Sequence, residues 1–91
     1  MFVIVSYDIA DDRRRTEIAS LLKNFGQRVQ KSIFECYLEE DHMLDLKSSI
    51  ERLIDVAKDS VRYYYLCKTD EKRVEYFGET VIYKDEDYFM I

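Results

Sequence analysis

Two kinds of hydrophobic spacing alternate along this chain, and their order restricts the folds that it can adopt. Residues 2–7 are a continuous apolar and β-branched run, which is typical of a central strand. A helical stripe follows, then a strand region at residues 28–39, a second helical stripe and a third strand region at 61–67. This order predicts an α+β domain in which helices cover one face of a sheet.

The first helical stripe has apolar residues at i, i+3, i+4 and i+7, namely Ile18, Leu21, Leu22 and Phe25. Either Asp11 or Asp12 is expected to cap its N-terminus, because a carboxylate oxygen there can accept backbone N–H bonds. Gly26 is expected at the C′ position that ends the helix.

The strand region at residues 28–39 is too long for one ordinary strand. We therefore expect a bend or tight reversal that splits it, near Ser32 to Cys36. The region alternates in part, and one side is expected to carry Val29, Lys31, Ile33, Glu35, Tyr37 and Glu39.

The second helix is expected to have Asp41 as its cap and an apolar stripe of Met43, Leu46, Ile50, Leu53, Ile54 and Ala57. A short strand at 80–83 and an apolar tail at 88–91 end the chain. The tail either frays or adds a strand to a sheet edge, its own or a partner's. If residues 28–39 supply two strands, the order β-α-β-β-α-β is the ferredoxin-like plan, with one additional C-terminal strand.

A chain of 91 residues predicts one domain, spanning 1–91. Domains of this size bury only roughly 60–65% of their unfolded surface, so dimerisation is a common source of further buried area. No apolar run is long enough to span a membrane and the first residues lack the pattern of a signal peptide, so we expect a cytoplasmic location. The cysteines Cys36 and Cys67 stand alone in apolar runs and are expected to be plain buried thiols.

The charge is unevenly distributed along the chain. The net charge of −5 argues against a protein that coats nucleic acid in general. Residues 1–31 nevertheless carry six basic and four acidic side chains, whereas residues 32–91 carry eight basic and fifteen acidic ones. A basic front on an acidic body suits a restricted surface that contacts phosphates, although solvated helix faces would give the same pattern.

Most catalytic arrangements lack their residues in this sequence. His42 is the one histidine, so a mechanism with a histidine base and a histidine acid is not supplied by one chain. No zinc-ligand spacing and no glycine-rich phosphate loop are present. Carboxylate chemistry with a hard metal remains, and Asp8 ends the first apolar strand shortly before a helix. Asp8 is either such a ligand or an ordinary turn residue, and a two-fold dimer would bring a second Asp8 to the site.

The residues around Asp8 resemble a known family. Between residues 7 and 35 the chain reads Tyr-Asp-Ile, an Asp at 11 or 12, arginines at 14–15, a Gly at 26, Arg-Val-Gln at 28–30 and Ser-Ile-Phe-Glu at 32–35. This pattern is similar to that of the CRISPR-associated "Cas two" protein family, one of the two adaptation proteins of that immune system.

The resemblance implies a homodimer whose late strand and tail, residues 80–91, pack on the partner protomer. It implies that Asp8 of each protomer is a catalytic residue and a ligand of Mg²⁺ or Mn²⁺, with one ion at the dimer axis. It also implies antiviral defence by spacer acquisition, endonuclease activity on RNA or DNA, and assembly with the CRISPR integrase ("Cas one"). Together with the basic front, it predicts a nucleic-acid-binding surface formed by Arg14, Arg15, Arg28, Lys31, Ser32 and Phe34.

Three functions are compatible with these features. The first is a Mg²⁺-dependent phosphodiesterase that acts through Asp8. The second is a non-catalytic dimeric adaptor that bridges the integrase and supports DNA. The third is a small ferredoxin-like domain that binds a protein or small molecule by its sheet edge, because this fold carries many functions.

Overall fold

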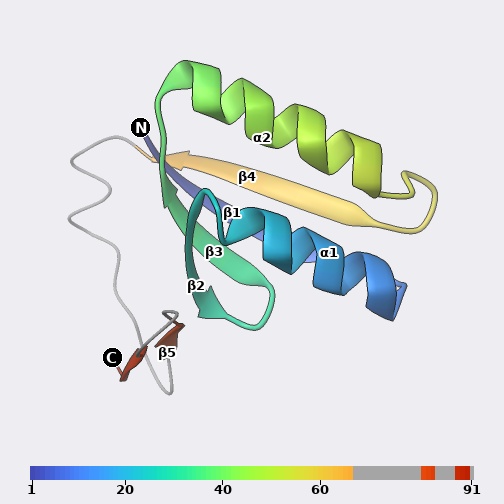
Figure 1. The fold of residues 1–91 in the computed structure, drawn as a ribbon, viewed down its shortest axis with the longest axis horizontal. Helices are drawn as coiled ribbons and strands as arrows, with labels where there is room; N and C mark the ends of the chain where they lie inside the picture. Colours follow the sequence, from blue (N-terminus) through green and yellow to red (C-terminus); the bar gives the residue numbers. More distant parts are fainter. Residues whose placement is uncertain (67–80, 84–87, 91) are drawn as a thin grey trace.

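One antiparallel sheet and two helices form the described part of the chain (Figure 1). The computed structural model describes residues 1–66, 81–83 and 88–90. The elements follow in the order β1 (Phe2–Asp8), α1 (Asp12–Leu22), β2 (Gly26–Gln30), β3 (Ile33–Tyr37), α2 (Glu40–Leu53), β4 (Ser60–Leu66), β5 (Val81–Tyr83) and β6 (Tyr88–Met90). The strand order in the sheet is β4-β1-β3-β2-β5-β6, so the first four strands form the ferredoxin-like plan that the sequence predicted.

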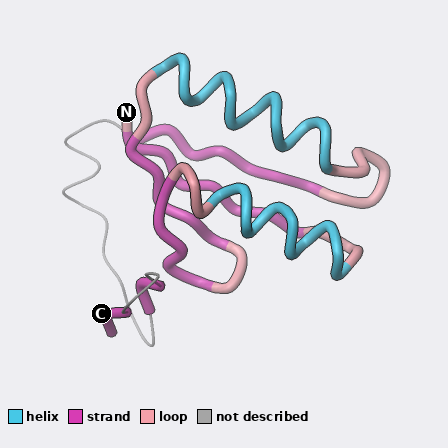
Figure 2. Tube along the Cα trace, in the orientation of Figure 1, coloured by secondary structure: helices cyan, strands magenta, loops and turns pink. Residues whose placement is uncertain are grey.

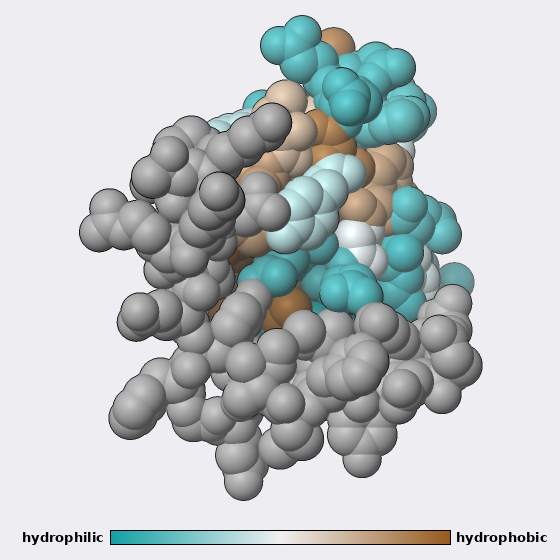
Figure 3. All heavy atoms as spheres, turned by 90° about the vertical axis from the view of Figure 1, so that its left-hand side faces the viewer, coloured by the Kyte–Doolittle hydropathy of each residue, from teal (hydrophilic) through white to brown (hydrophobic). Residues whose placement is uncertain are grey.

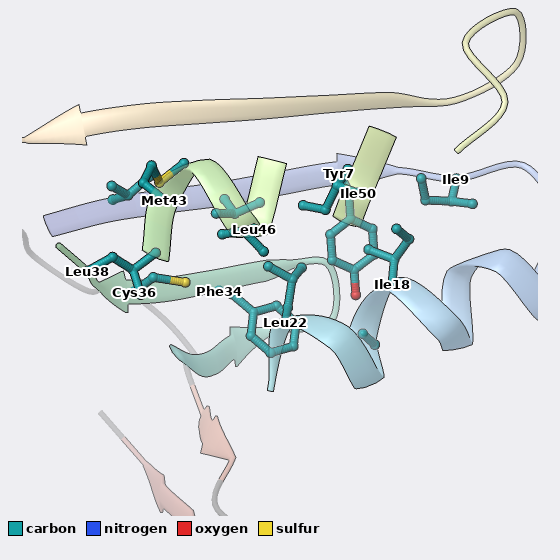
Figure 4. Packing of buried hydrophobic residues seen from close by; sticks show 13 residues of the cluster. Tyr7, Ile9, Ile18, Leu22, Phe34, Cys36, Leu38, Met43, Leu46 and Ile50 are labelled. Atoms are coloured by element: carbon teal, nitrogen blue, oxygen red, sulfur yellow. The ribbon is translucent and has the colours of Figure 1, made fainter. Parts of the chain in front are cut away.

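Both helices lie on one face of the sheet, as the tube view in Figure 2 shows. The core forms between them and the sheet (Figure 4), where the side chains of Val3, Val5 and Tyr7 on β1 are buried against those of α1 and α2. The helices contribute Ile18, Ala19 and Leu22 from α1, and Met43, Leu46 and Ile50 from α2. Burying one such large side chain contributes roughly 1.5–3 kcal/mol, so these periodic stripes explain why the segments fold as helices.

Helix α1 begins at the predicted cap but ends earlier than predicted. The carboxylate of Asp11 accepts a hydrogen bond from the backbone N–H of Arg14 at 2.9 Å, which confirms Asp11 as the N-cap. The helix ends at Leu22 with Lys23 as its C-cap, so the prediction that Gly26 is the C′ residue was wrong. Gly26 is instead the first residue of β2.

Gly26 is required because β3 passes close to its Cα. A Cβ at this position would lie 2.5 Å from Sγ of Cys36 and even closer to the backbone oxygen of Glu35. Any side chain at position 26 would therefore push β2 away from β3, where Gly26 pairs with Cys36. Position 26 therefore needs a glycine because two strands approach each other closely there, and not because a helix ends there.

The substitution Gly26→Ala is expected to destabilise the protein by about 1–3 kcal/mol, because the added methyl group meets backbone atoms that cannot move aside alone. The free energy of unfolding from urea denaturation measures this. Gln27→Ala, at the exposed neighbouring position, is the control and should change the free energy by less than about 0.5 kcal/mol. Equal stability of the two variants would contradict the close contact.

The reversal inside the second strand region lies at Lys31 and Ser32, between β2 and β3. It falls at the beginning of the predicted window. The residues Ile33, Glu35 and Tyr37 share the face away from the helices, as predicted, because Phe34 and Cys36 are buried in the core. The rest of the predicted alternation was wrong: a bulge between Arg28 and Gln30 interrupts it, and positions 31 and 39 lie outside the strands.

The N-cap of helix α2 lies two residues before the predicted one. Its N-cap is Glu39 rather than Asp41, which lies in the first turn. Ala57 lies beyond the end of α2 and is exposed, so it does not belong to the buried stripe. No helix among the described residues is both long and apolar enough to cross a membrane.

The last two strands extend the sheet beyond β2. Strand β5 pairs with β2 of the same chain, and β6 pairs with β5 over three residue pairs. The tail at Tyr88–Met90 is therefore a strand. That residues 80–91 pack on a partner protomer involves a second chain and stays a prediction.

Cys36 is confirmed as a plain buried thiol. Its side chain is fully buried in the core, and burial raises the pKa of the thiol to about 11. The thiol therefore stays protonated and unreactive at neutral pH. Cys67, the second predicted buried thiol, lies outside the described residues.

Candidate functional site

Asp8 is the last residue of β1 and lies on the face of the sheet that the helices leave open. Successive side chains of a strand point to opposite faces, and Val5 and Tyr7 are buried in the core. Ser6 and Asp8 consequently point to the open face, where Asp8 is exposed and pairs across the sheet with Ser60 of β4. The strand end thus presents a carboxylate to solvent from a paired, rigid backbone.

Two hollows flank Asp8. The first, of about 220 Å³, lies on the open sheet face and is lined by Ser6, Tyr7, Asp8, Ser60, Arg62 and Tyr64. The second, of about 190 Å³, lies towards the loops and is lined by Tyr7, Asp8, Ile9, Arg15, Lys31 and Ser32. Asp8 belongs to both, and the second hollow collects three of the predicted nucleic-acid-binding residues.

Arg15 stands in the second hollow, but its guanidinium also holds a loop. Its Nε and Nη2 donate hydrogen bonds to the backbone oxygen of Ile9 at 3.3 and 3.1 Å. Its Nη1 forms an ion pair with Asp12 at 2.6 Å. The half-buried Arg15 therefore adds positive charge beside Asp8 while fixing the first residue of the β1–α1 loop.

Arg28 fixes the β2–β3 turn in a similar way. Its Nε and Nη2 donate to the backbone oxygen of Lys31 at 3.0 and 2.6 Å. The hydroxyl of Tyr7 donates to the same oxygen at 3.2 Å, and the N–H of Tyr7 donates to the oxygen of Ser32 at 3.1 Å. The turn that carries Lys31 and Ser32 into the second hollow is thus tied to the strand that carries Asp8.

The phenol of Tyr7 serves as a donor in this arrangement. Burial raises its pKa, and the nearby positive charges of Arg28 and Arg15 offset part of that rise. The hydroxyl therefore keeps its proton at neutral pH and donates it to the backbone oxygen of Lys31.

Three of the predicted nucleic-acid-binding residues, Arg14, Arg28 and Phe34, do not line either hollow. Phe34 is fully buried in the core, so its ring has no exposed face on which a base could stack. The guanidinium carbon of Arg28 lies 5.8 Å from the centroid of that ring. Arg14 is engaged elsewhere, by a carboxylate that the sequence analysis did not single out.

That carboxylate belongs to Asp59, whose side chain is completely buried. Nε and Nη2 of Arg14 donate to its two oxygens at 2.8 and 3.1 Å. The N–H groups of Ala10 and Asp55 donate to the same carboxylate at 3.0 and 2.9 Å. No local sequence signal pairs Asp59 with an arginine 45 positions earlier, because only the fold brings them together.

The contacts of Asp59 stabilise the fold while its carboxylate is ionised. The hydrogen bond from Arg14 is the largest cause that holds its pKa far below the ordinary value, and the N–H groups of Asp55 and Ala10 add to it against the opposing effect of burial. A carboxyl group with a depressed folded pKa stabilises the fold above its unfolded pKa of about 3.9 and loses that contribution as the pH falls further.

We expect the melting temperature of Asp59→Asn to lie about 10 °C or more below that of the wild type at neutral pH, because a buried charge pair is broken. This difference in melting temperature should stay constant above about pH 5. It should shrink below about pH 4, because there Asp59 of the unfolded wild type takes up a proton, which favours unfolding, whereas the asparagine of the variant does not titrate. Thermal unfolding of both proteins across this range measures it. A difference that does not depend on pH would contradict the assignment.

The described part of one chain offers few ligands for a metal ion. Within residues 1–66, 81–83 and 88–90 there is no group of three His, Cys, Asp or Glu residues that could hold a metal ion. Asp8 is nevertheless an exposed carboxylate on a paired strand end, and Mg²⁺ binds proteins through one or two carboxylates while keeping several waters. One chain therefore fits half of a hard-metal site.

Comparison with known proteins agrees with this geometry. A family model described as "CRISPR associated protein Cas2" matches residues 1–74. A relative from Chloroflexus aurantiacus, named CRISPR-associated endoribonuclease Cas2 3, is 37% identical over 91 residues, which cover 100% of this chain and 98% of that protein. The crystal structure of Streptococcus pyogenes Cas2 aligns with a TM-score of 0.78 and 37% identity, covering 86% of this chain and 100% of that chain. A structure described as a partial Cas6-RT-Cas1–Cas2 complex aligns with a TM-score of 0.71 and 27% identity, covering 81% of this chain and 87% of that chain.

Proposed function

The chain belongs to the CRISPR-associated Cas2 family, and from this premise we propose that it is a metal-dependent endonuclease of CRISPR spacer acquisition. The family resemblance read from residues 7–35 is thereby confirmed. In this proposal the protein hydrolyses phosphodiesters of RNA or DNA in the prokaryotic cytoplasm. The observation that carries it is the exposed carboxylate of Asp8 between two hollows, of which the first is lined in part by Arg62 and the second by Arg15 and Lys31.

Asp8 would hold the metal ion, Mg²⁺ or Mn²⁺, together with Asp8 of a second protomer. When bound there, such an ion lowers the pKa of its water and stabilises charge on a phosphate oxygen. The residues of the chain bind the substrate: the side chain of Lys31 is exposed at the second hollow, beside Ser32 and the guanidinium of Arg15. Such contacts hold a phosphate chain in place without reading its sequence.

The charge distribution supports this placement of the nucleic acid. Strand β1 runs from the end of the molecule where α2 begins to the opposite end, where Asp8 lies (Figure 1). Figure 3 views the first of these ends, and hydrophilic side chains gather where α2 begins. The exposed acids Glu39, Glu40 and Asp41 lie there and would repel phosphates, which leaves the Asp8 end as the favourable one.

A homodimer is part of the proposal, because a single Asp8 provides only half of the ligands. The open sheet face supports it: Tyr37 and Tyr64 are 63% and 45% exposed, and Ile4 and Ile33 are only half-buried. An isologous contact through this face would bring the two Asp8 side chains together at the axis. Residues 80–91 would then reach the partner protomer.

We expect the full chain to be dimeric at micromolar concentration and a chain ending at residue 79 to dimerise at least tenfold more weakly, because the tail contributes buried area to the interface. Sedimentation equilibrium measures the two dissociation constants, and circular dichroism checks that the shorter chain is folded. Leu44→Ser, at an exposed position on α2, is the control and should not change dimerisation. A monomeric full chain would refute the dimer, and equal dissociation constants would refute the role of the tail.

The substitution Asp8→Asn is expected to reduce hydrolysis of single-stranded RNA or duplex DNA by more than about 100-fold, because it removes a metal ligand directly. Asp45→Asn, an exposed carboxylate on α2, is the control and should keep full activity. Removal of divalent ions with EDTA should abolish wild-type activity, and Mg²⁺ or Mn²⁺ should restore it. Equal cleavage by the wild type and Asp8→Asn would place the activity elsewhere.

The second candidate is a non-catalytic adaptor that bridges the Cas1 integrase and supports DNA. A solved neighbour is a complex described as containing Cas1 and Cas2, and each chain here supplies one candidate carboxylate at the site. Spacer uptake in cells carrying Asp8→Asn separates the two: lost uptake supports catalysis in acquisition, and normal uptake supports the adaptor.

A further inference from the structure

The β1–α1 loop that follows Asp8 is fixed at every residue. The backbone oxygen of Ile9 accepts hydrogen bonds from Arg15 at 3.3 and 3.1 Å. The N–H of Ala10 donates to Oδ1 of Asp59 at 3.0 Å. The carboxylate of Asp11 caps the helix, and its backbone oxygen accepts from the N–H of Arg15 at 2.9 Å.

The orientation of Asp8 depends on this backbone. Among the described residues its carboxylate has no hydrogen-bond partner, so no side chain aims it directly. Its main chain is held on one side by Ala10, two residues later, and on the other by Ser60, its register partner on β4. Asp59 reaches both sides, because it accepts the N–H of Ala10 and immediately precedes Ser60 in the chain.

The side chain of Asp59 is held rigidly between these elements. Its carboxylate has no exposed surface and accepts four hydrogen bonds, two of them from the guanidinium of Arg14. The other two come from Ala10 and from Asp55 in the loop after α2. A bidentate arginine–carboxylate pair fixes direction as well as distance, so the start of α1, the β1–α1 loop and the start of β4 form one unit.

We propose that Asp59, held by Arg14, is a positioning residue for Asp8: it sets the direction of that carboxylate, and with it the affinity for a divalent ion, without touching ion or substrate. The proposal rests on the metal-binding role of Asp8 in the proposed function. It also assigns Arg14 to positioning, although the sequence predicted a contact with nucleic acid.

The test compares Asp59→Asn with the wild type by Mn²⁺ titration, at a temperature at which circular dichroism shows both to be folded. We expect Mn²⁺ to bind about 10–100-fold more weakly to Asp59→Asn, as for other groups that orient metal ligands. The kcat for phosphodiester cleavage should fall by a similar factor, whereas KM should change less, because Lys31 and Ser32 lie on a turn that Tyr7 and Arg28 hold without Asp59. Arg14→Lys keeps the positive charge but not the bidentate geometry, so this variant should keep only part of the wild-type affinity for Mn²⁺.

Met43→Ala provides the matched control for a loss of stability alone. Met43 is buried at the end of the core opposite Ile9 (Figure 4), so its truncation lowers the melting temperature without touching the loop. Mn²⁺ affinity in this variant should equal that of the wild type. Equal weakening in Met43→Ala and Asp59→Asn, or no weakening in Asp59→Asn, would overturn the proposal.

A metal-free measurement distinguishes failure of the positioning role from failure of the proposed function. Amide hydrogen exchange of Asp8 and Ile9 should be at least tenfold faster in Asp59→Asn than in either the wild type or Met43→Ala. If the wild type binds Mn²⁺ no better than Asp8→Asn, the metal site is refuted, and faster exchange still establishes that Asp59 orders this loop. Unchanged exchange refutes positioning whatever the wild type binds.

Discussion

The alternation of side chains along β1 determines where everything else in this molecule can lie. Val3, Val5 and Tyr7 are buried under the two helices, and this burial fixes the opposite direction for every second residue. Asp8 therefore falls on the open face at the strand end. A shift of the β1 register by one residue would bury this carboxylate and expose the core, so the same apolar contacts that stabilise the fold also place the candidate site.

Around Asp8 the arginines bind groups of the protein itself. Arg14 binds the carboxylate of Asp59, Arg15 binds the oxygen of Ile9, and Arg28 binds the oxygen of Lys31. Sequence reasoning assigned all three to nucleic acid, because a basic segment looks the same whether its charges face phosphates or carbonyl oxygens. The geometry separates these uses: a guanidinium that ties down a loop shapes the surface and contributes charge to it, while the exposed Lys31 is placed for direct phosphate contact.

Local signals predicted much of the fold, and the mistakes arose where distant strands meet. The stripes at Ile18 to Leu22 and at Met43 to Ile50 are periodic in the chain itself, so both helices were predictable. Gly26 was misassigned because its reason is the proximity of Glu35 and Cys36 on another strand. Asp59 gave no signal at all, since its partners Arg14 and Ala10 lie 45 and 49 positions away and only the folded chain brings them within reach.

The remaining question concerns how much chemistry a single carboxylate can support. One Asp8 with water ligands binds a divalent ion weakly, because most of the ion's coordination stays with solvent. Two Asp8 side chains across a two-fold axis would change this only if both were held in one direction, since a freely rotating pair loses more conformational entropy on binding. The burial of Asp59 and the four hydrogen bonds to it restrict the backbone of Asp8 in the free protein. An adaptor would need these hydrogen bonds only for the stability of the fold, whereas metal binding at the dimer axis would also need them to hold the backbone of Asp8 in place.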